Sequence, residues 1–449
     1  MRFLKDKEFL KGMLAIAVPV SLQNLISSSL NMIDTLMISS LGQSSIAAVG
    51  LANQIFFLYI LLTFGINSGS SIFIAQFWGR DDVLSIKKVL GLAITISTIA
   101  GTIFTFIALV LPEFVMGLFI EEQEVIQLGA SYLRIVGLSY IITAISFAFS
   151  IALRTTGRPG VPLKVSIISF TVNTALNYVL IFGKLGMPAM GIRGAALGTL
   201  IARIVEILLI VYAIYGTKSI LAASFSELMS WKKDFVKRYI DTIYPVILTE
   251  GFWALGQVMY TAAYARIGEE ATAAVQLTNT IQNVFFVIVR GLANACGVMV
   301  GSKVGAGEED KAYEYAISFI IIATISGLVL GIVMALGPDI PLSLFRGLDP
   351  SLYAVSRRLL VFMGLTFVIR VYNTIAIVGV LRAGGETKVA MKIDLSTVWL
   401  IGVPLAFIGA LVLKLPVEYV FLLVTMEEVV KAFLGIPIIK SGKWIKNLT

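Results

Sequence analysis

The chain of 449 residues contains no histidine and a single cysteine, Cys296. Histidine is the commonest metal ligand and the side chain whose charge changes near neutral pH, so any proton chemistry must use carboxylates. One cysteine cannot form a disulfide within the chain or supply a zinc site built from cysteines. Cys296 lies in an apolar stretch, and we expect it to be a packing residue.

Charge is also scarce. Only 14% of the residues are charged and 58% are hydrophobic, whereas soluble domains have about 25% charged and about 45–50% apolar residues. The mean hydropathy is +0.92. These values argue against a soluble enzyme, a disordered chain and a nucleic-acid-binding protein. We attribute the net charge of +8 to basic cytoplasmic loops of a membrane protein and not to a nucleic-acid partner.

Several catalytic motifs are missing from the sequence. It has no GxxxxGK[ST] motif, which argues against a self-contained ATP-driven pump, and no HExxH or GxSxG motif, which argues against an intramembrane protease or esterase. We therefore expect a protein that is not an enzyme, with no catalytic residues and no cofactor.

The apolar residues are grouped in windows long enough to cross a membrane, which requires about 20 mainly apolar residues. This pattern predicts an all-α polytopic membrane protein with twelve transmembrane helices. The windows are 13–40, 46–73, 86–110, 126–153, 161–183, 191–215, 239–265, 271–298, 312–336, 354–380, 389–412 and 417–438.

The distribution of Lys and Arg predicts the orientation, because basic residues accumulate in cytoplasmic loops. Of the 35 basic residues, 24 are assigned to one set of connections and 7 to the opposite set. We therefore expect both termini on the cytoplasmic side of the membrane. The larger set includes Arg2, Lys5, Arg154, Arg382 and Lys431, and the smaller set includes Arg346.

The longest connection, 216–238, separates an N-terminal lobe of six spans (1–215) from a C-terminal lobe of six spans (239–449). Its basic, amphipathic stretch 231–238 predicts a helix that lies on the anionic cytoplasmic leaflet of the bilayer.

The two lobes repeat each other at a constant offset of 226, at which Pro19 matches Pro245 and Gly79 matches Gly305. A second register, at an offset of 228, pairs Arg154 with Arg382. Six is an even number of spans, so both copies enter the membrane from the same side. This predicts two parallel lobes related by a pseudo-two-fold axis along the membrane normal, which usually enclose a cavity that opens to either side.

Carboxylates within spans mark candidate functional sites, because a charge in the membrane is costly. Asp34 lies in the first span and has no basic residue one helical turn away. Glu250 lies in the seventh span, at the repeat position of Asn24. We predict that both carboxylates couple transport to a cation.

Polar residues of the fifth and sixth spans extend the candidate site around Asp34. Asn173 and Asn177 are four residues apart and share a helix face, and Thr199 lies in the sixth span. Together with Asp34 these oxygens suit Na⁺, or a proton in a polar pocket. Hydrogen bonding between helices explains the same Asn and Thr residues equally well from the sequence alone.

Other intramembrane residues have weaker signals. Arg203 and Glu206 are expected to neutralise each other, Asp394 to serve as a cap or in a salt bridge, and Arg290 and Arg370 have no assigned partner. Pro19 and Pro245 are predicted hinges.

A third group of residues could line a cavity in which flat organic cations stack, although ordinary packing explains each of them as well. These residues are Asn31, Trp253, Tyr260, Tyr264, Gln282, Phe285 and Phe286.

Short motifs across nearly the whole chain resemble those of the MATE (multidrug and toxic compound extrusion) family. They are Ala15-Ile-Ala-Val-Pro-Val, Asp34-Thr, Leu41-Gly, Ala47-Ala-Val-Gly-Leu, Gly191-Ile-Arg-Gly-Ala-Ala-Leu-Gly-Thr199, Leu381-Arg-Ala-Gly-Gly-Glu-Thr387 and Trp399-Leu-Ile-Gly-Val-Pro404. The resemblance implies a cation-coupled antiporter that exports cationic, amphipathic compounds by alternating access.

The resemblance also implies roles for individual residues. Asp34 resembles the family's first-span carboxylate, Asn173 its fifth-span Asn, Thr199 its sixth-span Thr and Glu250 its seventh-span Glu. The family's fifth-span motif often reads Asn-x-x-x-Asp, but here the last position is Asn177, which leaves Na⁺ and H⁺ open as coupling ions. No acid stands in the tenth span, so we expect no two-carboxylate cation site in the second lobe.

The leading hypothesis is therefore a secondary active multidrug efflux transporter that exchanges organic cations for Na⁺ or H⁺. Its expected partners are these cations and the lipid bilayer, and we expect a monomer. The alternatives are a flippase of lipid-linked precursors, with a similar two-lobe architecture, and a membrane receptor that transports nothing.

Overall fold

The computed structural model describes residues 6–345 and 348–449, and all regular structure in them is helical. Arg2, Lys5 and Arg346, three of the residues in the charge-based topology, lie outside the described residues. The helices up to the long connection are α1 (Lys7–Ser39), α2 (Gln43–Gly79), α3 (Val83–Val110), α4 (Pro112–Gly117), α5 (Gln123–Val136), α6 (Ser139–Thr155), α7 (Gly160–Phe182), α8 (Ile192–Val211) with the π-helical turn Tyr212–Gly216, and α9 (Phe225–Leu228).

The second half of the chain has more π-helical segments than the first. Its elements are α10 (Lys233–Ala265), α11 (Glu269–Gly305), α12 (Glu309–Leu336), α13 (Asp339–Leu342), α14 (Pro350–Asn373) with the π-helical segment Thr374–Leu381, α15 (Thr387–Thr397), the π-helical turn Val398–Gly402, α16 (Val403–Phe407), the π-helical turn Ile408–Val412, and α17 (Val417–Lys440).

The twelve predicted windows all fall on helices, but fewer helices qualify as apolar spans. Within the described residues, nine helices are long and apolar enough to cross a membrane, or ten if α5 and α6, bent by 48°, form one span. The other two windows coincide with α10 and α17, which are long enough but more polar. They carry Glu250 on α10 and Glu427, Glu428 and Lys431 on α17. The expected count of twelve is therefore supported only in its coarser form, an all-helical chain with about ten apolar spans.

Local sequence signals explain several helix ends. Asp82 caps α3, since its carboxylate accepts a hydrogen bond from the Ser85 backbone N–H at 3.0 Å. Helix α9 begins with a capping box between Ser224 and Glu227. Helix α7 ends at Gly183, whose φ of 66° is a left-handed conformation that glycine adopts without strain.

The chain divides into two compact units that are interleaved along the sequence. Unit 1 contains the chain up to Ser21, Ala75–Arg80 and Tyr244–Thr449, and unit 2 contains Leu22–Ile74 and Asp81–Ile243. Helices α1, α2 and α10 therefore pass from one unit to the other within their length.

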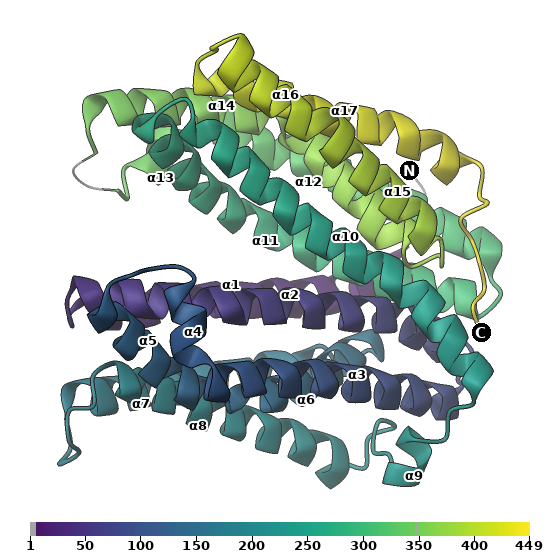
Figure 1. Cartoon of the computed structure of the whole chain (residues 1–449). Coiled ribbons are helices and arrows are strands. Elements are labelled where there is room, and N and C mark those ends of the chain that lie inside the picture. Colours follow the sequence, from purple (N-terminus) through teal and green to yellow (C-terminus); the bar gives the residue numbers. More distant parts are fainter. Residues whose placement is uncertain (1–5, 346–347) are drawn as a thin grey trace. The chain divides into compact units, whose positions relative to one another are not determined.

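Each unit has its own apolar core. In unit 1, α11, α12 and α14 pack side by side, and Cys296, Phe319 and Phe367 are buried in their shared core (Figure 1). Cys296 is a free, buried thiol, as a packing residue should be. In unit 2, α7 packs along α8 and α3 along α6, while the stacked rings of Tyr59 and Tyr140 lie 5.2 Å apart between centroids.

The basic stretch of the long connection does not form a helix of its own, contrary to the prediction. Helix α10 begins at Lys233, so Lys237 and Arg238 lie in the first turns of the same helix that continues to Ala265. The helix continues because 233–244 contains neither proline nor glycine, and a long helix tolerates one proline, here Pro245, with a bend.

Candidate ion-coupling site and polar pocket

The predicted site around Asp34 is assembled within unit 2 by α1, α7 and α8. The Asn177 side-chain N–H donates to Asp34 Oδ1 at 2.8 Å and to Asn173 Oδ1 at 3.1 Å. The Asn173 N–H in turn donates to Thr199 Oγ1 at 3.3 Å. The structure thus brings all four predicted residues of the first lobe into one hydrogen-bonded chain.

Glycines on α8 allow α7 to come close enough for this chain to form. A Cβ atom at Gly194 would lie 2.6 Å from the backbone carbonyl of Leu180, and one at Gly198 would collide with Asn177 Oδ1. Asn173 and Asn177 are both almost fully buried by this packing. Small residues four apart are a common device for close helix contact in membranes.

The carboxylate of Asp34 has no ion-pair partner in the described part of the chain. Arg203, on the neighbouring α8, pairs with Glu206 at 2.6 Å, as predicted. Asn177 Oδ1 is buried without a hydrogen-bond partner among the described residues and faces Gly198. In this conformation Asn177 presents its N–H groups, not its oxygen, to Asp34 and Asn173. The amide would have to turn over before its oxygen could join Asp34 in binding a hard cation.

A second polar contact of unit 2 joins α1, α6 and α7. Arg154, which the charge count had placed in a loop, is the penultimate residue of α6 and donates to Gln23 Oε1 at 2.7 Å. Gln23 then donates to Ser166 Oγ at 2.8 Å. The Arg154 Nε–H is buried without a partner in the described part of the chain. This guanidinium is thus held by a neutral amide and not by a carboxylate.

Unit 1 contains a chain of buried ions instead. Arg382 pairs with Glu250 at 2.7 Å and lies 3.8 Å from Asp394, and Lys431 pairs with Asp394 at 2.8 Å. Arg382 lies in the turn before α15, as the charge count assumed, whereas Lys431 lies within α17. Both are buried, at 4% and 5% exposed, and are therefore not solvated loop charges. Glu250, predicted as a coupling carboxylate, forms an ion pair with Arg382.

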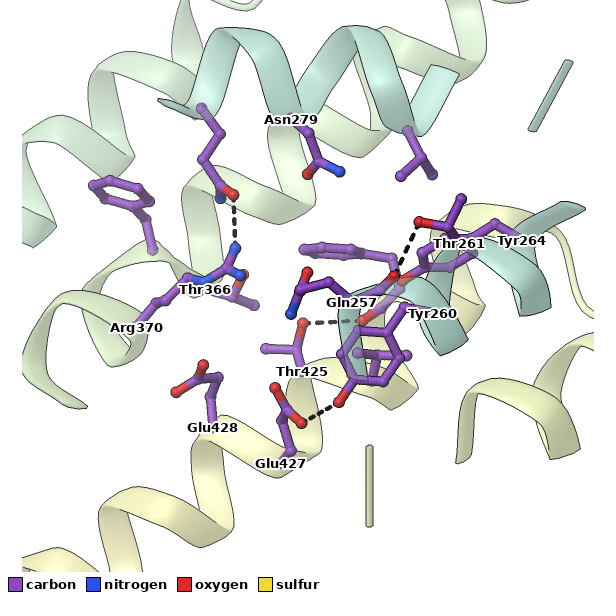
Figure 2. Close-up of a pocket in the computed structure, with 15 residues that line it drawn as sticks. Gln257, Tyr260, Thr261, Tyr264, Asn279, Thr366, Arg370, Thr425, Glu427 and Glu428 are labelled. Carbon is purple, nitrogen blue, oxygen red and sulfur yellow. Dashed lines mark hydrogen bonds between the residues drawn. The ribbon is translucent and has the colours of Figure 1, made fainter. Parts of the chain in front are cut away.

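The chain of ions continues to a pocket lined by α10, α11, α14 and α17. Lys431 lies 3.7 Å from Glu428, and Asn373 donates to Glu428 Oε2 at 2.6 Å. The neighbouring Glu427 accepts a hydrogen bond from the Tyr260 hydroxyl (Figure 2). The empty space in the pocket and at its mouth, open solvent included, is about 640 Å³.

A π-helical turn makes room for the pair of Tyr260 and Glu427. A Cβ atom at Gly402, the last residue of the turn Val398–Gly402, would collide with both the Tyr260 hydroxyl and a Glu427 oxygen. Elsewhere in the pocket wall, Arg370 (Figure 2) donates to Gln282 Oε1 at 2.6 Å. The Arg370 guanidinium also lies 5.9 Å from the Phe286 ring centre. π-Helical turns often occur at functional sites.

The predicted cavity residues are distributed as follows. Tyr260, Tyr264 and Gln282 line this pocket. Trp253, Phe285 and Phe286 belong to unit 1 but are not among the lining residues, and Trp253 is exposed. Asn31 is an exposed residue of unit 2.

The expectation that the second lobe has no two-carboxylate cation site stays a prediction, but the structure does bring two glutamates to one pocket there. Glu427 and Glu428 line the same pocket, but they come from α17 and not from the tenth span. The sequence carried a signal, since two adjacent glutamates in an apolar window are followed three residues later by Lys431. Charges in a span at such spacing indicate an internal polar network.

Two other expectations have clear outcomes in unit 1. Asp394 takes part in salt bridges with Lys431 and Arg382, as one of the two predicted alternatives stated. Arg370, which had no assigned partner, is hydrogen-bonded to Gln282.

The predicted hinge residues Pro19 and Pro245 both lie inside long helices. Each is within three residues of the position at which its helix, α1 or α10, passes from one unit to the other.

Comparison with known proteins supports the fold and the repeat. The MatE family model matches twice, at residues 19–179 and 245–408. The two matches begin at Pro19 and Pro245, the same pair of prolines that the offset of 226 brings together in the sequence.

Similar proteins of known sequence span nearly the whole chain. The "Probable multidrug resistance protein NorM" of Thermotoga maritima is 23% identical over 98% of this chain and 94% of its own length. The "Probable multidrug resistance protein YoeA" of Bacillus subtilis is 27% identical over 89% of this chain and 86% of its own length.

A solved structure shows the same fold. It is described as the "Outward-facing conformation of a multidrug resistance MATE family transporter of the MOP superfamily" and has a TM-score of 0.87 at 20% identity, with 97% of this chain and 96% of that chain covered. Since the MatE model matches well over half of the sequence, the chain is a multi-pass membrane transporter of the prokaryotic MATE family.

Proposed function

We propose that the protein is a secondary active multidrug efflux transporter that exports cationic, amphipathic compounds in exchange for Na⁺ or H⁺. The observation that carries the proposal is the Asp34 carboxylate, which lies in a membrane-spanning helix without an ion-pair partner in the described chain and is bound by the amide of Asn177. A carboxylate in this environment gains most from binding a cation or a proton. The relatives named as multidrug resistance proteins support the efflux function.

Asp34, Asn173, Asn177 and Thr199 form the coupling site in this proposal. When the Asn177 amide turns over, its oxygen joins those of Asp34 and Asn173, which gives the oxygen ligands that suit Na⁺. A proton would instead bind to Asp34 directly. Either event changes the hydrogen bonds between α1 and α7, so occupancy of the site is linked to the position of α1.

The pocket of unit 1 supplies the cavity for organic cations in this proposal. Glu427 and Glu428 attract positive charge, and the rings of Tyr260 and Tyr264 offer faces on which a flat cation stacks. Glu250 stabilises the pocket indirectly, because it balances Arg382 in the ionic chain that ends at Glu428.

The finer architecture completes the proposal. Twelve spans form two parallel six-helix lobes, 1–215 and 239–449, joined by 216–238, with both termini on the cytoplasmic side of the inner membrane. The bends at Pro19 and Pro245 permit alternating access, and the transporter works as a monomer.

Efflux of an ethidium-like dye from vesicles, with Na⁺ and pH gradients imposed separately, tests the proposal. Dye movement driven by one of the gradients is the expected result, and the driving gradient identifies the coupling ion. The absence of dye movement under both gradients would contradict the proposal, and movement of a lipid-linked precursor in the same vesicles would favour a flippase.

A further inference from the structure

The end of α2 has an unusual place in the molecule. Residues 43–74 of this helix belong to unit 2, but Ala75–Arg80 group with unit 1. There the end of α2 crosses the end of α11, the helix that corresponds to it in the repeat. Both helix ends lead into loops that the Lys and Arg distribution assigns to the cytoplasmic side.

The crossing is made by backbone groups in contact. A Cβ atom at Gly79 would collide with the backbone carbonyl of Ser302, and one at Gly305 would collide with the backbone carbonyl of Gln76. These contacts are reciprocal, because the repeat offset of 226 pairs Gly79 with Gly305 and Gln76 with Ser302. Reciprocal contacts of this kind are characteristic of a two-fold axis.

A third contact lies between the other two. A Cβ atom at Gly301 would lie 2.8 Å from the Cβ of Ala75, its own repeat partner. Each helix therefore has small residues four apart, Ala75 with Gly79 and Gly301 with Gly305. Such spacing lets helix backbones touch in a membrane.

The side chain of Gln76 ties the crossing to the C-terminal segment 444–449. Gln76 is fully buried. Its amide N–H groups donate to the carbonyl oxygens of Ala383 at 3.1 Å and Lys446 at 3.2 Å, and its oxygen accepts from the Leu448 backbone N–H at 2.7 Å.

The C-terminal segment is itself held in place. The indole of Trp444 is buried, and a Cβ atom at Gly384 would collide with it. The Lys446 backbone N–H donates to the Gly384 carbonyl at 2.7 Å, and its ammonium pairs with Glu386. The Thr449 hydroxyl accepts from Arg80, the residue that follows α2, at 2.8 Å. We call this segment the C-terminal strap.

We propose that the crossing of α2 and α11, held by Gln76 and the C-terminal strap, is a latch that closes the cytoplasmic end of the transporter and opens once in each transport cycle. The inference rests on the proposed alternating access. The bonds to Gln76 suit a latch, because water replaces each of them when the crossing opens. The backbone contacts allow no intermediate position, so the crossing is either packed or separated.

Reversible cross-linking tests whether the crossing must open. The pair Ala75→Cys and Gly301→Cys, in a Cys296→Ala background, places two cysteines in contact, because a Cβ atom at Gly301 would lie 2.8 Å from the Ala75 Cβ. A small separation of the two helix ends brings the Cβ atoms to the spacing of a disulfide, about 3.8 Å. Oxidation is expected to stop the dye efflux that the reduced double variant shows, and reduction to restore it, so the reduced double variant is the control. Efflux that continues at full rate in the cross-linked protein would overturn the proposal.

Thiol labelling tests the latch without relying on transport. In a Ser302→Cys reporter with Cys296→Ala, the substitution Gln76→Leu or deletion of residues 446–449 should speed labelling by about tenfold, as expected when a state is destabilised by about 1.4 kcal/mol. Gln54→Leu, on an exposed part of the same helix, is the matched control.

The two experiments separate the latch from the proposed function. Labelling that is equally slow in the Gln76→Leu, deletion and control variants would overturn the role of the strap. Failure of the unmodified protein to move dye would contradict the efflux function, but the labelling rates would still decide whether the latch exists.

Discussion

The two units place an arginine at corresponding positions but give it different partners. Arg154 in unit 2 and Arg382 in unit 1 are paired by the repeat, and each contacts the first long helix of its half of the chain. Arg154 meets the neutral amide of Gln23, whereas Arg382 meets the carboxylate of Glu250. The repeat has therefore kept the helix contact and changed its charge.

The difference extends to the rest of each unit. In unit 1, Arg382 begins an ionic chain through Asp394 and Lys431 to Glu428. In unit 2 the polar residues form neutral hydrogen bonds, and Asp34 is left without a cationic partner in the described chain. A neutralised carboxylate stabilises structure, while one without a counter-charge is available to a cation, and for this reason we propose the coupling site in unit 2.

The largest effect is expected at Asp34. The substitution Asp34→Asn removes the only charge of the coupling site, so dye efflux in vesicles should fall to the level without transporter, while the protein still folds. Asp310→Asn, an exposed residue at the start of α12, is the matched control. Efflux at the unmodified rate in Asp34→Asn would contradict the assignment of the coupling to unit 2.

The two arginines should differ in their effect on stability. Arg382→Met leaves the partly buried Glu250 without its partner and Asp394 with Lys431 alone, and should cost about 3–5 kcal/mol. Arg154→Met leaves only the neutral acceptor of Gln23 unsatisfied and should cost about 1–3 kcal/mol. Thermal unfolding in detergent measures both, with the exposed Arg193→Met as control. Equal losses of stability would mean that the ionic partner of Arg382 does not matter.

A second carboxylate in unit 2 should bring its site closer to the ionic character of unit 1. In Asn177→Asp, a second carboxylate takes the place of the amide that lies 2.8 Å from the Asp34 carboxylate. Two carboxylates at this distance bind a cation or a proton more tightly than one. Efflux should therefore be half-maximal at a several-fold lower Na⁺ concentration, or at higher pH if H⁺ is the coupling ion. An unchanged ion dependence would show that Asn177 does not face the ion.

The smallest effect is expected for an ion pair outside the spans. The Lys87 ammonium, 2.8 Å away, and the Ser224 backbone N–H lower the pKa of Glu227 from its ordinary 4.5 to about 2. The stability that this contact contributes is complete above pH 4.5 and is lost as the pH falls toward 2. Glu227→Gln should therefore lower the unfolding temperature slightly at neutral pH and flatten its acid dependence. A fall in unfolding temperature as large as that of Arg382→Met would contradict the expected contrast between surface ion pairs and buried ones.

The sequence predicted the helices well, since apolar windows and loops between them mark where a chain crosses a membrane. It also predicted the site around Asp34, because Asn173 and Asn177 share one face by their spacing. It did not identify Glu427 and Glu428, which were passed over as part of an apolar window. It did not reveal that Glu250 has an ion-pair partner, because that partner, Arg382, is 132 residues away.

What the sequence determined by itself was local or periodic: the membrane class, the helices and the repeat of one half of the chain in the other, which follow from hydropathy and spacing along the chain. Only the tertiary structure decided which charges meet. The difference between Arg154 beside Gln23 and Arg382 beside Glu250 depends on contacts between distant helices. The backbone contact of Gly79 with Ser302 likewise arises only because two helices cross. Electrostatic and steric contacts both depend on distance in space, which position along the chain does not give.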